Sequence, residues 1–309
     1  MALDPQSKDL LEQIKAAGRP PTHALTPAEA RAATDFSSFS GEPEHVGKVE
    51  NKLIPGPERQ IPIRIYTPVG DGPFPALVYF HGGGWVAGDL DGVDVSCRLL
   101  TNRAHCIVIS VDYRLAPEHK YPAAVEDAYA AVKWTAEQGP TIQADPEWIA
   151  VGGDSAGGNL AAVVSLMARD KQEVSLKFQM LIYPVTHHAY TTKSYEENGD
   201  GYLLTKDTMK WCWDHYLNSP EEGREPYASP LLAEDLTGLP PALVVTAGYD
   251  PLRDEGRAYA ERLKHAGVYV EEAHYDELMH GFFWMPGVID QGKKSIEKAA
   301  VSLKQAFNK

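Results

Sequence analysis

The sequence contains few cysteines and no recognisable export signal. Only Cys97, Cys106 and Cys212 occur among 309 residues, and no two of them form a Cys-x-x-Cys pair. A sparse and odd number of thiols is typical of buried cysteines in a reducing compartment. The N-terminus also lacks a basic stretch followed by an apolar one, so no secretory signal is expected. The sequence therefore predicts a cytoplasmic protein.

Long apolar runs and basic clusters are also missing. The longest apolar stretch, residues 160–168, is interrupted by Ser165 and is much shorter than a membrane span. Lys and Arg number 29 against 43 Asp and Glu, a net charge of −14. We therefore expect neither a nucleic-acid nor a membrane partner. Hydrophobic residues make up 43% of the chain, which excludes disorder for most of it.

Runs of β-branched and aromatic residues predict the strands. Residues 45–54 and 60–68 alternate apolar with polar side chains, which predicts an exposed antiparallel pair. Compact apolar runs follow at 75–80, 106–113, 149–153, 178–184, 242–247 and 268–275. Unbroken β-branched stretches in such runs are typical of strands buried on both faces, as in a parallel sheet. Helical segments lie between or after them at 121–138, 155–170, 253–267 and 293–308. This alternation predicts a doubly wound α/β sheet.

Two segments stand apart from this alternation. Residues 1–45 precede the first strand and contain a helical pattern over 4–18, then a capping box from Thr26 to Glu29 that predicts a second short helix. We interpret this segment as N-terminal cap helices. The other segment comprises residues 185–235.

Nearly sixty residues separate the strand that ends at Pro184 from the next strand, more than a plain crossover needs. A helix start at Thr205 is followed by an apolar face, made of Met209, Cys212, Trp213 and Tyr216. We interpret residues 185–235 as an inserted cap; the alternative is an ordinary surface excursion with a small core of its own. The catalytic domain would then consist of residues 46–184 and 236–309.

The segment Gly153-Asp154-Ser155-Ala156-Gly157 fits the pattern G-x-S-x-G. A predicted strand precedes it and a predicted helix follows, the context in which a sharp turn raises a nucleophilic serine above a sheet. The helix N-terminus adds a positive potential and a free N–H at Ala156. A glycine-rich turn with an incidental serine is the alternative interpretation.

A second glycine-rich segment, His81-Gly82-Gly83-Gly84-Trp85, directly follows the strand 75–80. Consecutive glycines let backbone N–H groups converge on one point, as an oxyanion hole requires. A dinucleotide fingerprint through Gly82, Gly84 and Ala87 is the rival, but two strands already precede it and it leaves the serine turn unexplained. His81 fits a hydrogen-bond donor that holds the loop better than a catalytic base.

A serine nucleophile needs an acid and a base, which follow it in this order in α/β-hydrolases. Asp250 lies just after the strand 242–247, whereas Asp254 and Glu255 fall in the first turn of a predicted helix, where acidic residues are common. His280 lies in a loop after the last predicted strand. His274 falls within that strand and His265 within a helix, so we predict His280 as the base.

Metal binding is not expected from this sequence. The adjacent His187 and His188 lack the spacing and the partners of a metal site.

Aromatic residues and the cap could line an apolar substrate cleft or could equally form core. The candidate substrate contacts are Trp85, Met209, Trp213 and Phe282; Trp211 and Phe283 are further aromatic candidates.

The chain resembles the hormone-sensitive-lipase-like carboxylesterases of the α/β-hydrolase fold. The matching segments are HGGGW (81–85), VDYRLAPEHKYPAAVEDA (111–128), GDSAGGNLA (153–161), TAGYDPLRDEG (246–256) and MHGF (279–282). The resemblance implies an eight-stranded, mostly parallel sheet flanked by helices, with a helical cap. It also implies a Ser155–Asp250–His280 triad, and oxyanion-hole N–H groups from Gly83, Gly84 and Ala156.

The predicted activity is hydrolysis of short-to-medium-chain esters of small molecules through an acyl-enzyme, without cofactor or metal. The enzyme would act as a monomer or homodimer. Two alternatives stay open: an amidase or deacetylase with the same triad, and a ligand-binding module on a hydrolase scaffold.

Overall fold

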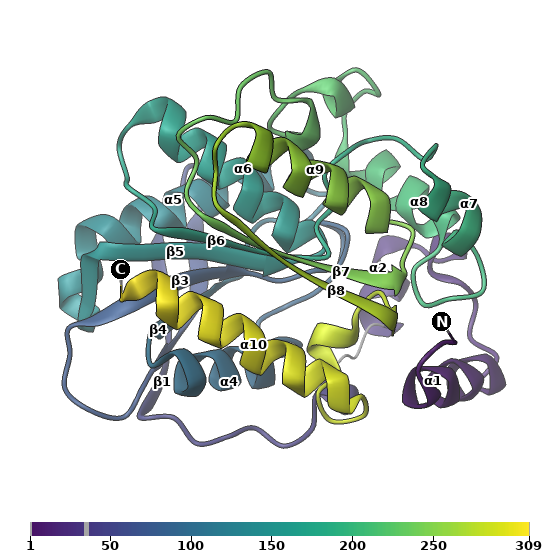
Figure 1. Ribbon diagram of the computed structural model, residues 1–309, viewed down its shortest axis with the longest axis horizontal. Coiled ribbons are helices and arrows are strands. Elements are labelled where there is room, and N and C mark those ends of the chain that lie inside the picture. The colour runs from purple at the N-terminus through teal and green to yellow at the C-terminus, as the bar shows by residue number, and fades with distance from the viewer. Residues whose placement is uncertain (1, 34–36, 309) are drawn as a thin grey trace.

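The computed structural model describes residues 2–33 and 37–308, and its centre is an eight-stranded sheet (Figure 1). The strand order is β1-β2-β4-β3-β5-β6-β7-β8. The strands are β1 (Lys48–Pro55), β2 (Gln60–Thr67), β3 (Phe74–Phe80), β4 (Ile107–Val111), β5 (Ala144–Asp154), β6 (Phe178–Ile182), β7 (Ala242–Tyr249) and β8 (Val270–Met279). β2 pairs antiparallel with β1 and β4, and the other pairs are parallel. The predicted mostly parallel sheet is confirmed.

β4 and β6 are buried along their whole length, as their composition predicts. The edge strand β8 is mostly half-exposed or exposed, so the prediction of burial on both faces is wrong for residues 268–275. Along β3, Ala76, Val78 and Phe80 belong to one core cluster, whereas Leu77 and Tyr79 belong to the other. Successive side chains of a strand point to opposite faces, so a strand buried on both faces must be apolar throughout.

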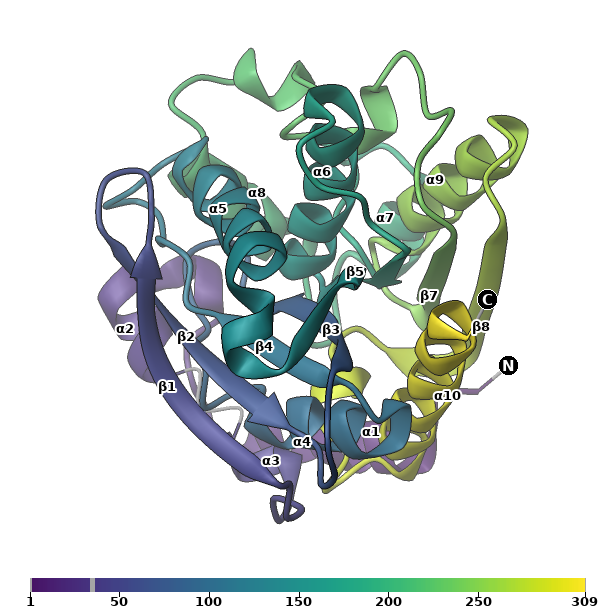
Figure 2. The same cartoon turned by 90° about the vertical axis from the view of Figure 1, so that its left-hand side faces the viewer.

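Helices form a layer on each face of the sheet (Figure 2). α5 (Ala123–Gln138), α6 (Ala156–Lys171) and α9 (Arg253–His265) cover one face, and α4 (Asp94–Ala104) and α10 (Asp290–Phe307) cover the other. The short helices η2 (Gly139–Ile142) and η5 (Phe282–Trp284) complete the body. α4 is absent from the predicted elements. No helix within residues 2–33 and 37–308 has the length and hydropathy needed to cross a membrane.

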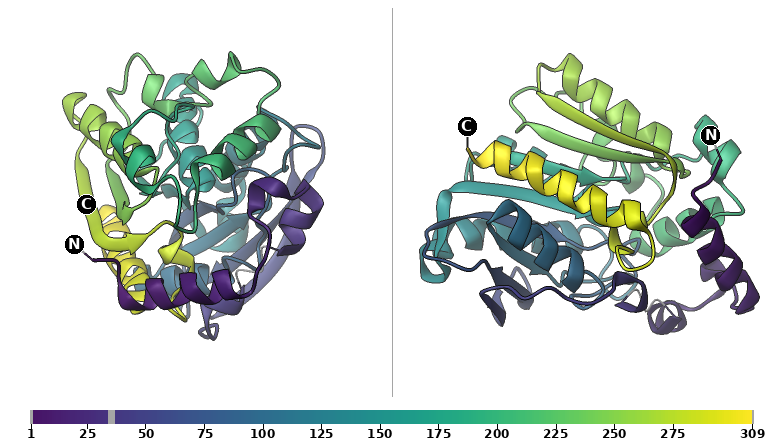
Figure 3. Two further views of the ribbon diagram at one scale, coloured as in Figure 1. Left: turned by 90° about the vertical axis from the view of Figure 1, so that its right-hand side faces the viewer. Right: turned by 60° about the horizontal axis from the view of Figure 1, so that its bottom comes forward.

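The N-terminal segment and residues 193–216 of the inserted segment lie at the carboxyl end of the parallel strands (Figure 3), whereas residues 230–232 of the inserted segment pack on α6 and α9. The N-terminal segment holds α1 (Pro5–Ala16), η1 (Thr22–Ala24), α2 (Pro27–Ala33) and α3 (Ser37–Ser40). The inserted segment holds α7 (Lys193–Asn198), α8 (Lys206–Tyr216), η3 (Glu222–Arg224) and η4 (Pro230–Leu232). α8 contacts η1. Of the predicted 1–45 segment, residues 1 and 34–36 lie outside the described residues.

The local signals that predicted helices in these segments correspond to hydrogen bonds. The Thr26 N–H donates to the Glu29 carboxylate at 2.8 Å, and the Glu29 N–H donates to Thr26 Oγ1 at 3.3 Å, which is the predicted capping box. Thr205 Oγ1 accepts from the Thr208 N–H at 3.1 Å and begins α8. The predicted apolar face of α8 is buried; it consists of Met209, Cys212, Trp213 and Tyr216.

Arg31 of α2 joins the N-terminal segment to the body. Its Nη1 and Nη2 donate to the two carboxylate oxygens of Glu118, at 2.9 and 2.6 Å. The hydrogen bond from Arg31 lowers the pKa of Glu118 from its ordinary 4.5 to about 2. Because the pKa is lower in the folded state, the stabilisation is complete above about pH 4.5 and is lost as the pH falls toward 2.

We therefore expect Glu118→Gln to lower the melting temperature by about 1–2 °C at pH 7, since half-exposed pairs contribute less than about 1 kcal/mol. Thermal unfolding of both proteins between pH 7 and pH 3 checks this. The difference in melting temperature between wild type and Glu118→Gln should narrow below about pH 4.5. A difference that stays constant or widens on acidification would contradict the assigned pair.

Candidate active site

Ser155 lies in a tight turn between β5 and α6. Its φ of +57° is in the left-handed region, which costs a non-glycine residue on the order of 1–3 kcal/mol. The Ser155 N–H donates to the carbonyl of Ile182 on β6 at 2.9 Å, and its own carbonyl accepts from the Asn159 N–H at 3.0 Å. The neighbouring strand and the following helix together hold the strained turn, as the G-x-S-x-G pattern predicts.

Glycine is required on both sides of Ser155 because other backbone lies very close. A Cβ on Gly157 would stand 1.9 Å from the carbonyl oxygen of Phe80, and one on Gly153 would stand 2.4 Å from that of Gly157. Phe80 also pairs with Gly153 across β3 and β5. The serine turn therefore lies beside the glycine-rich segment that follows β3.

The structure brings Ser155, His280 and Asp250 into one chain of hydrogen bonds. His280 Nε2 lies 3.0 Å from Ser155 Oγ, and His280 Nδ1 lies 2.7 Å from Asp250 Oδ2. Asp250 is fully buried, and His280 and Ser155 are 5% and 6% exposed. A carboxylate accepts, so Nδ1 carries the proton and Nε2 is free to accept one from the serine. This is the arrangement that a general base requires.

The two partners of Ser155 are positioned by neighbouring strands. Asp250 follows β7, and its Oδ1 accepts from the Leu252 N–H at 2.8 Å. His280 follows β8, which pairs with β7. The buried ring of Tyr183 packs on the His280 ring with centroids 4.4 Å apart. Tyr183 was not among the predicted site residues, because an aromatic residue at the end of an apolar strand gives no signal distinct from core.

The glycine-rich segment after β3 forms a strained turn. Gly83 and Gly84 have φ of +116° and +61°, and a Cβ on Gly83 would lie 2.1 Å from the Ala87 carbonyl oxygen. No acceptor within the described residues takes the N–H of Gly83 or of Gly84. Ala156 is the first residue of α6, where N–H groups have no partner in the helix. The three predicted N–H donors therefore stand on adjacent turns.

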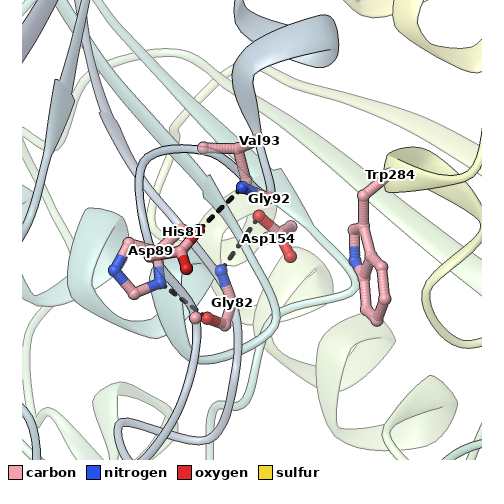
Figure 4. Close-up of a pocket in the computed structure, with 8 residues that line it drawn as sticks. His81, Gly82, Asp89, Gly92, Val93, Asp154 and Trp284 are labelled. Carbon is pink, nitrogen blue, oxygen red and sulfur yellow. Dashed lines mark hydrogen bonds between the residues drawn. The ribbon is translucent and has the colours of Figure 1, made fainter. Parts of the chain in front are cut away.

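Asp154, beside the nucleophile, fastens this turn to β5 (Figure 4). Its fully buried carboxylate accepts from Tyr79 Oη at 2.8 Å and from the Gly82 N–H at 3.1 Å. Burial raises the pKa of Asp154, and the Tyr79 hydrogen bond opposes that rise. Asp154 was not a predicted site residue. An acidic residue within a buried motif of otherwise small residues could have indicated a structural role beside the nucleophile.

His81 acts on the same turn. Its Nδ1 lies 2.7 Å from the Gly82 carbonyl, and its ring stacks on Tyr113 with centroids 4.4 Å apart. This agrees with the interpretation of His81 as a residue that holds the loop. The cavity of about 10 Å³ beside it, shown in Figure 4, is the size of one water molecule and is too small for a substrate.

The four candidate substrate contacts are all buried. Trp85 stacks flat on Tyr216 of α8 with centroids 4.2 Å apart, and it also packs against Trp213 at 4.6 Å. Met209 belongs to the same core cluster, and Phe282 to the cluster on the opposite face of the sheet. The structure thus joins the glycine-rich turn to the inserted segment through aromatic packing, and contact with substrate stays a prediction for these residues.

The competing residues have other partners. Asp254 accepts from the Ser194 N–H at 2.7 Å, and the buried Glu255 accepts from the Thr186 N–H at 2.7 Å. His274 Nδ1 pairs with Thr246 Oγ1 at 2.8 Å, and His265 Nδ1 with the Glu261 carbonyl at 2.7 Å. In the part of the chain that the structure describes, no three His, Cys, Asp or Glu residues form a potential metal site.

Comparison with known proteins places this site in a family. A family model described as alpha/beta hydrolase fold matches residues 77–284. Carboxylic ester hydrolase LipN of Mycobacterium tuberculosis is 51% identical over 240 residues, which cover 76% of this chain and 64% of that relative. The chain therefore aligns with less than two thirds of LipN. Ethyl acetate hydrolase of Pseudomonas putida is 35% identical over 99% of both chains.

A solved ester hydrolase from the metagenome of Lake Arreo, in complex with a bipyridine phosphonate derivative, superposes with a TM-score of 0.96. Its sequence is 43% identical to this one, and the superposition covers 99% of this chain and 100% of the solved chain. The names of these relatives support the predicted carboxylic ester hydrolysis. The chain belongs to the α/β-hydrolase fold family, in the hormone-sensitive-lipase-like group that its motifs predict.

Proposed function

We propose that this chain is a serine carboxylesterase with Ser155 as nucleophile, His280 as general base and Asp250 as the acid that orients it. The hydrogen-bonded chain from Ser155 Oγ through the His280 ring to Asp250 carries this proposal. In the first step His280 Nε2 takes the proton of Ser155 as Oγ attacks the ester carbonyl. Asp250 holds the imidazole in the required tautomer and stabilises its positive charge.

The tetrahedral intermediate places a negative charge on the former carbonyl oxygen. The N–H groups of Gly83, Gly84 and Ala156 would bind it, and loss of one such donor costs roughly 3–4 kcal/mol of transition-state stabilisation. His280 then protonates the departing alcohol, which leaves an acyl group on Ser155. Water, activated by the same histidine, releases the acid and restores the serine.

Small esters with short-to-medium acyl chains fit this site best. Ser155 and His280 are almost completely covered. A Cβ on Gly84 would lie 2.3 Å from Cys212 Sγ, so α8 rests directly on the glycine-rich turn. We assign residues 1–45 and 185–235 to a cap that limits substrate length. A full-length relative named ethyl acetate hydrolase also supports short substrates.

Met209→Ala tests the cap assignment. The smaller side chain enlarges the space beneath α8, so kcat/KM for p-nitrophenyl octanoate is expected to rise at least about tenfold relative to the acetate. Leu232→Ala is the control, because Leu232 is partly exposed within the same inserted segment. Chain-length profiles of the three proteins are compared below their melting temperatures. An unchanged profile in Met209→Ala would contradict a cap that sets specificity.

A chain-length series of p-nitrophenyl esters, with p-nitroanilides of the same acyl groups, tests the activity. We expect turnover of the esters, fastest for short acyl groups, and much slower turnover of the anilides. Faster anilide cleavage would favour an amidase. Tight binding of the esters without turnover by folded protein would favour a binding module.

We further propose a cytoplasmic location and a monomeric or homodimeric state. The three cysteines are free and buried, which supports a reducing compartment. A single chain supplies Ser155, Asp250 and His280, which supports a site complete within one subunit.

A further inference from the structure

We infer that Arg31 is a positioning residue that fixes the turn carrying the oxyanion N–H groups, an inference that rests on the proposed esterase function. Its Nε donates to the carbonyl of Val86 at 2.7 Å, and its Nη2 donates to the carbonyl of Ala116 at 2.8 Å. Val86 follows Gly84 by two residues in the glycine-rich turn. A residue of the N-terminal segment therefore bonds directly to the backbone of this turn.

The turn needs such support because it contains a strained residue. Trp85 has a φ of +60°, a conformation that bulky side chains rarely adopt and that persists only where surroundings impose it. Gly83 and Gly84, the proposed donors, immediately precede it. If Trp85 relaxed to negative φ, the peptide planes on either side of it would rotate, and the segment before it would have to adjust. Gly83 and Gly84 have no Cβ to resist that adjustment, so their N–H groups would shift away from the developing oxyanion.

Contacts of the ring and of the backbone hold Trp85 in this conformation. Its ring stacks on Tyr216 and packs against Trp213, and its carbonyl accepts from the Ala116 N–H at 2.8 Å. Arg31 adds a bond to the next carbonyl along the chain, that of Val86. Because Arg31 also binds the Ala116 carbonyl, it ties the strained turn to the segment that supports it.

The planar guanidinium suits this task. It presents donors in a fixed fork, so that one side chain can bind the Val86 and Ala116 carbonyls while facing the Glu118 carboxylate. A lysine ammonium, a point charge on a flexible stem, does not reproduce this arrangement. The carboxylate of Glu118 balances the positive charge of Arg31. We therefore assign the role of Arg31 in catalysis to its hold on the turn, rather than to electrostatic attraction between its charge and the oxyanion.

The experiment compares Arg31→Ala with wild type on p-nitrophenyl acetate. We expect kcat to fall between about 10-fold and 100-fold while KM stays within about twofold. The reason is that displacement of the donors destabilises the transition state, whose oxygen carries the negative charge, more than it weakens binding of the uncharged ester. Arg31→Lys is expected to show an intermediate loss. If Arg31→Ala does not fold, Arg31→Lys carries the test, and wild-type kcat in it overturns the inference.

Two further variants separate positioning from general stability. Arg19→Ala removes an arginine of the same N-terminal segment whose hydrogen bond goes to the Ala33 carbonyl, and it should retain wild-type kcat. Glu118→Gln removes the ion pair but leaves the Arg31 bonds to both carbonyls available, so its kcat should exceed that of Arg31→Ala. Equal losses in Arg31→Ala and Glu118→Gln would overturn the inference.

The rate of inactivation by a p-nitrophenyl phosphonate gives a second readout, because its reaction with serine also builds negative charge on oxygen. This rate should fall in Arg31→Ala by a factor similar to the fall in kcat. A folded Arg31→Ala with wild-type kcat, or with reduced kcat and an unchanged inactivation rate, overturns the inference about Arg31 and leaves the proposed esterase function standing. Wild type that neither hydrolyses the ester nor reacts with the phosphonate overturns the proposed function and the inference together.

Discussion

Replacement of Ser155 by alanine is expected to lower kcat for p-nitrophenyl acetate by about 10⁵-fold, since removal of a serine nucleophile eliminates covalent catalysis. The fold should persist. Ser155 Oγ has His280 as its hydrogen-bond partner, and the backbone bonds of the turn, to Ile182 and Asn159, do not involve the side chain. Initial rates, with circular dichroism and thermal unfolding as checks of the fold, measure the effect.

Ser165→Ala is the matched control for this experiment. Ser165 is also buried and lies in α6, where its hydroxyl donates to the Ala161 carbonyl at 2.8 Å. It lies ten residues after Ser155, about 15 Å further along by the rise of a helix, so the kcat of Ser165→Ala should equal that of wild type. A Ser155→Ala protein with kcat within about tenfold of wild type would show that another group is the nucleophile.

His280→Ala is expected to reduce kcat by about 10⁴-fold to 10⁶-fold, because the serine then lacks a base and the leaving alcohol lacks an acid. The buried carboxylate of Asp250 also loses its partner at 2.7 Å. Initial rates at pH 7, together with a melting temperature, separate loss of catalysis from loss of fold.

His274→Ala is the control for the base. His274 lies on β8, six residues before His280, and it pairs with Thr246 and with Asp276, whose carboxylate is 3.2 Å away. Burial lowers the pKa of His274, and the Asp276 charge opposes that change. Its loss should leave kcat near the wild-type value. The opposite pattern, an active His280→Ala and an inactive His274→Ala, would assign the base to His274.

The sheet could be predicted because its strands have a distinct composition. Residues 75–80 and 242–247 are apolar apart from Thr246, and the structure buries most of β3 and β7. The positions of Asp250 and His280 could be predicted as well, since each follows a strand in the order that a serine hydrolase requires. Fold and candidate triad thus depend on local patterns that a single sequence carries.

Helix α4 was not predicted because its buried face is mixed. Ser96 and Thr101 are buried beside apolar residues, and their hydroxyls donate to the carbonyls of Phe283 and Cys97. Polar side chains satisfied in this way weaken the apolar periodicity on which helix prediction depends.

Two supports of the glycine-rich turn, Arg31 and Asp154, could not be predicted from the sequence in the way that His81 could. The bond from Arg31 to Val86 spans 55 residues and the bond from Gly82 to Asp154 spans 72. Arg31 is not unusual where it stands in the sequence, and the acidic Asp154 stands out within its motif without indicating which backbone group it binds. Contacts of this kind arise from the packing of distant segments, so they become visible only in the folded chain.

The central claim is that Ser155 is the nucleophile of an esterase site. The most direct measurement is to inactivate wild type with a p-nitrophenyl phosphonate and to locate the adduct by peptide mass spectrometry. We predict one phosphonyl group per chain, on Ser155, with loss of ester hydrolysis in proportion to labelling. An adduct on another residue, or full hydrolysis by protein labelled on Ser155, would contradict the account.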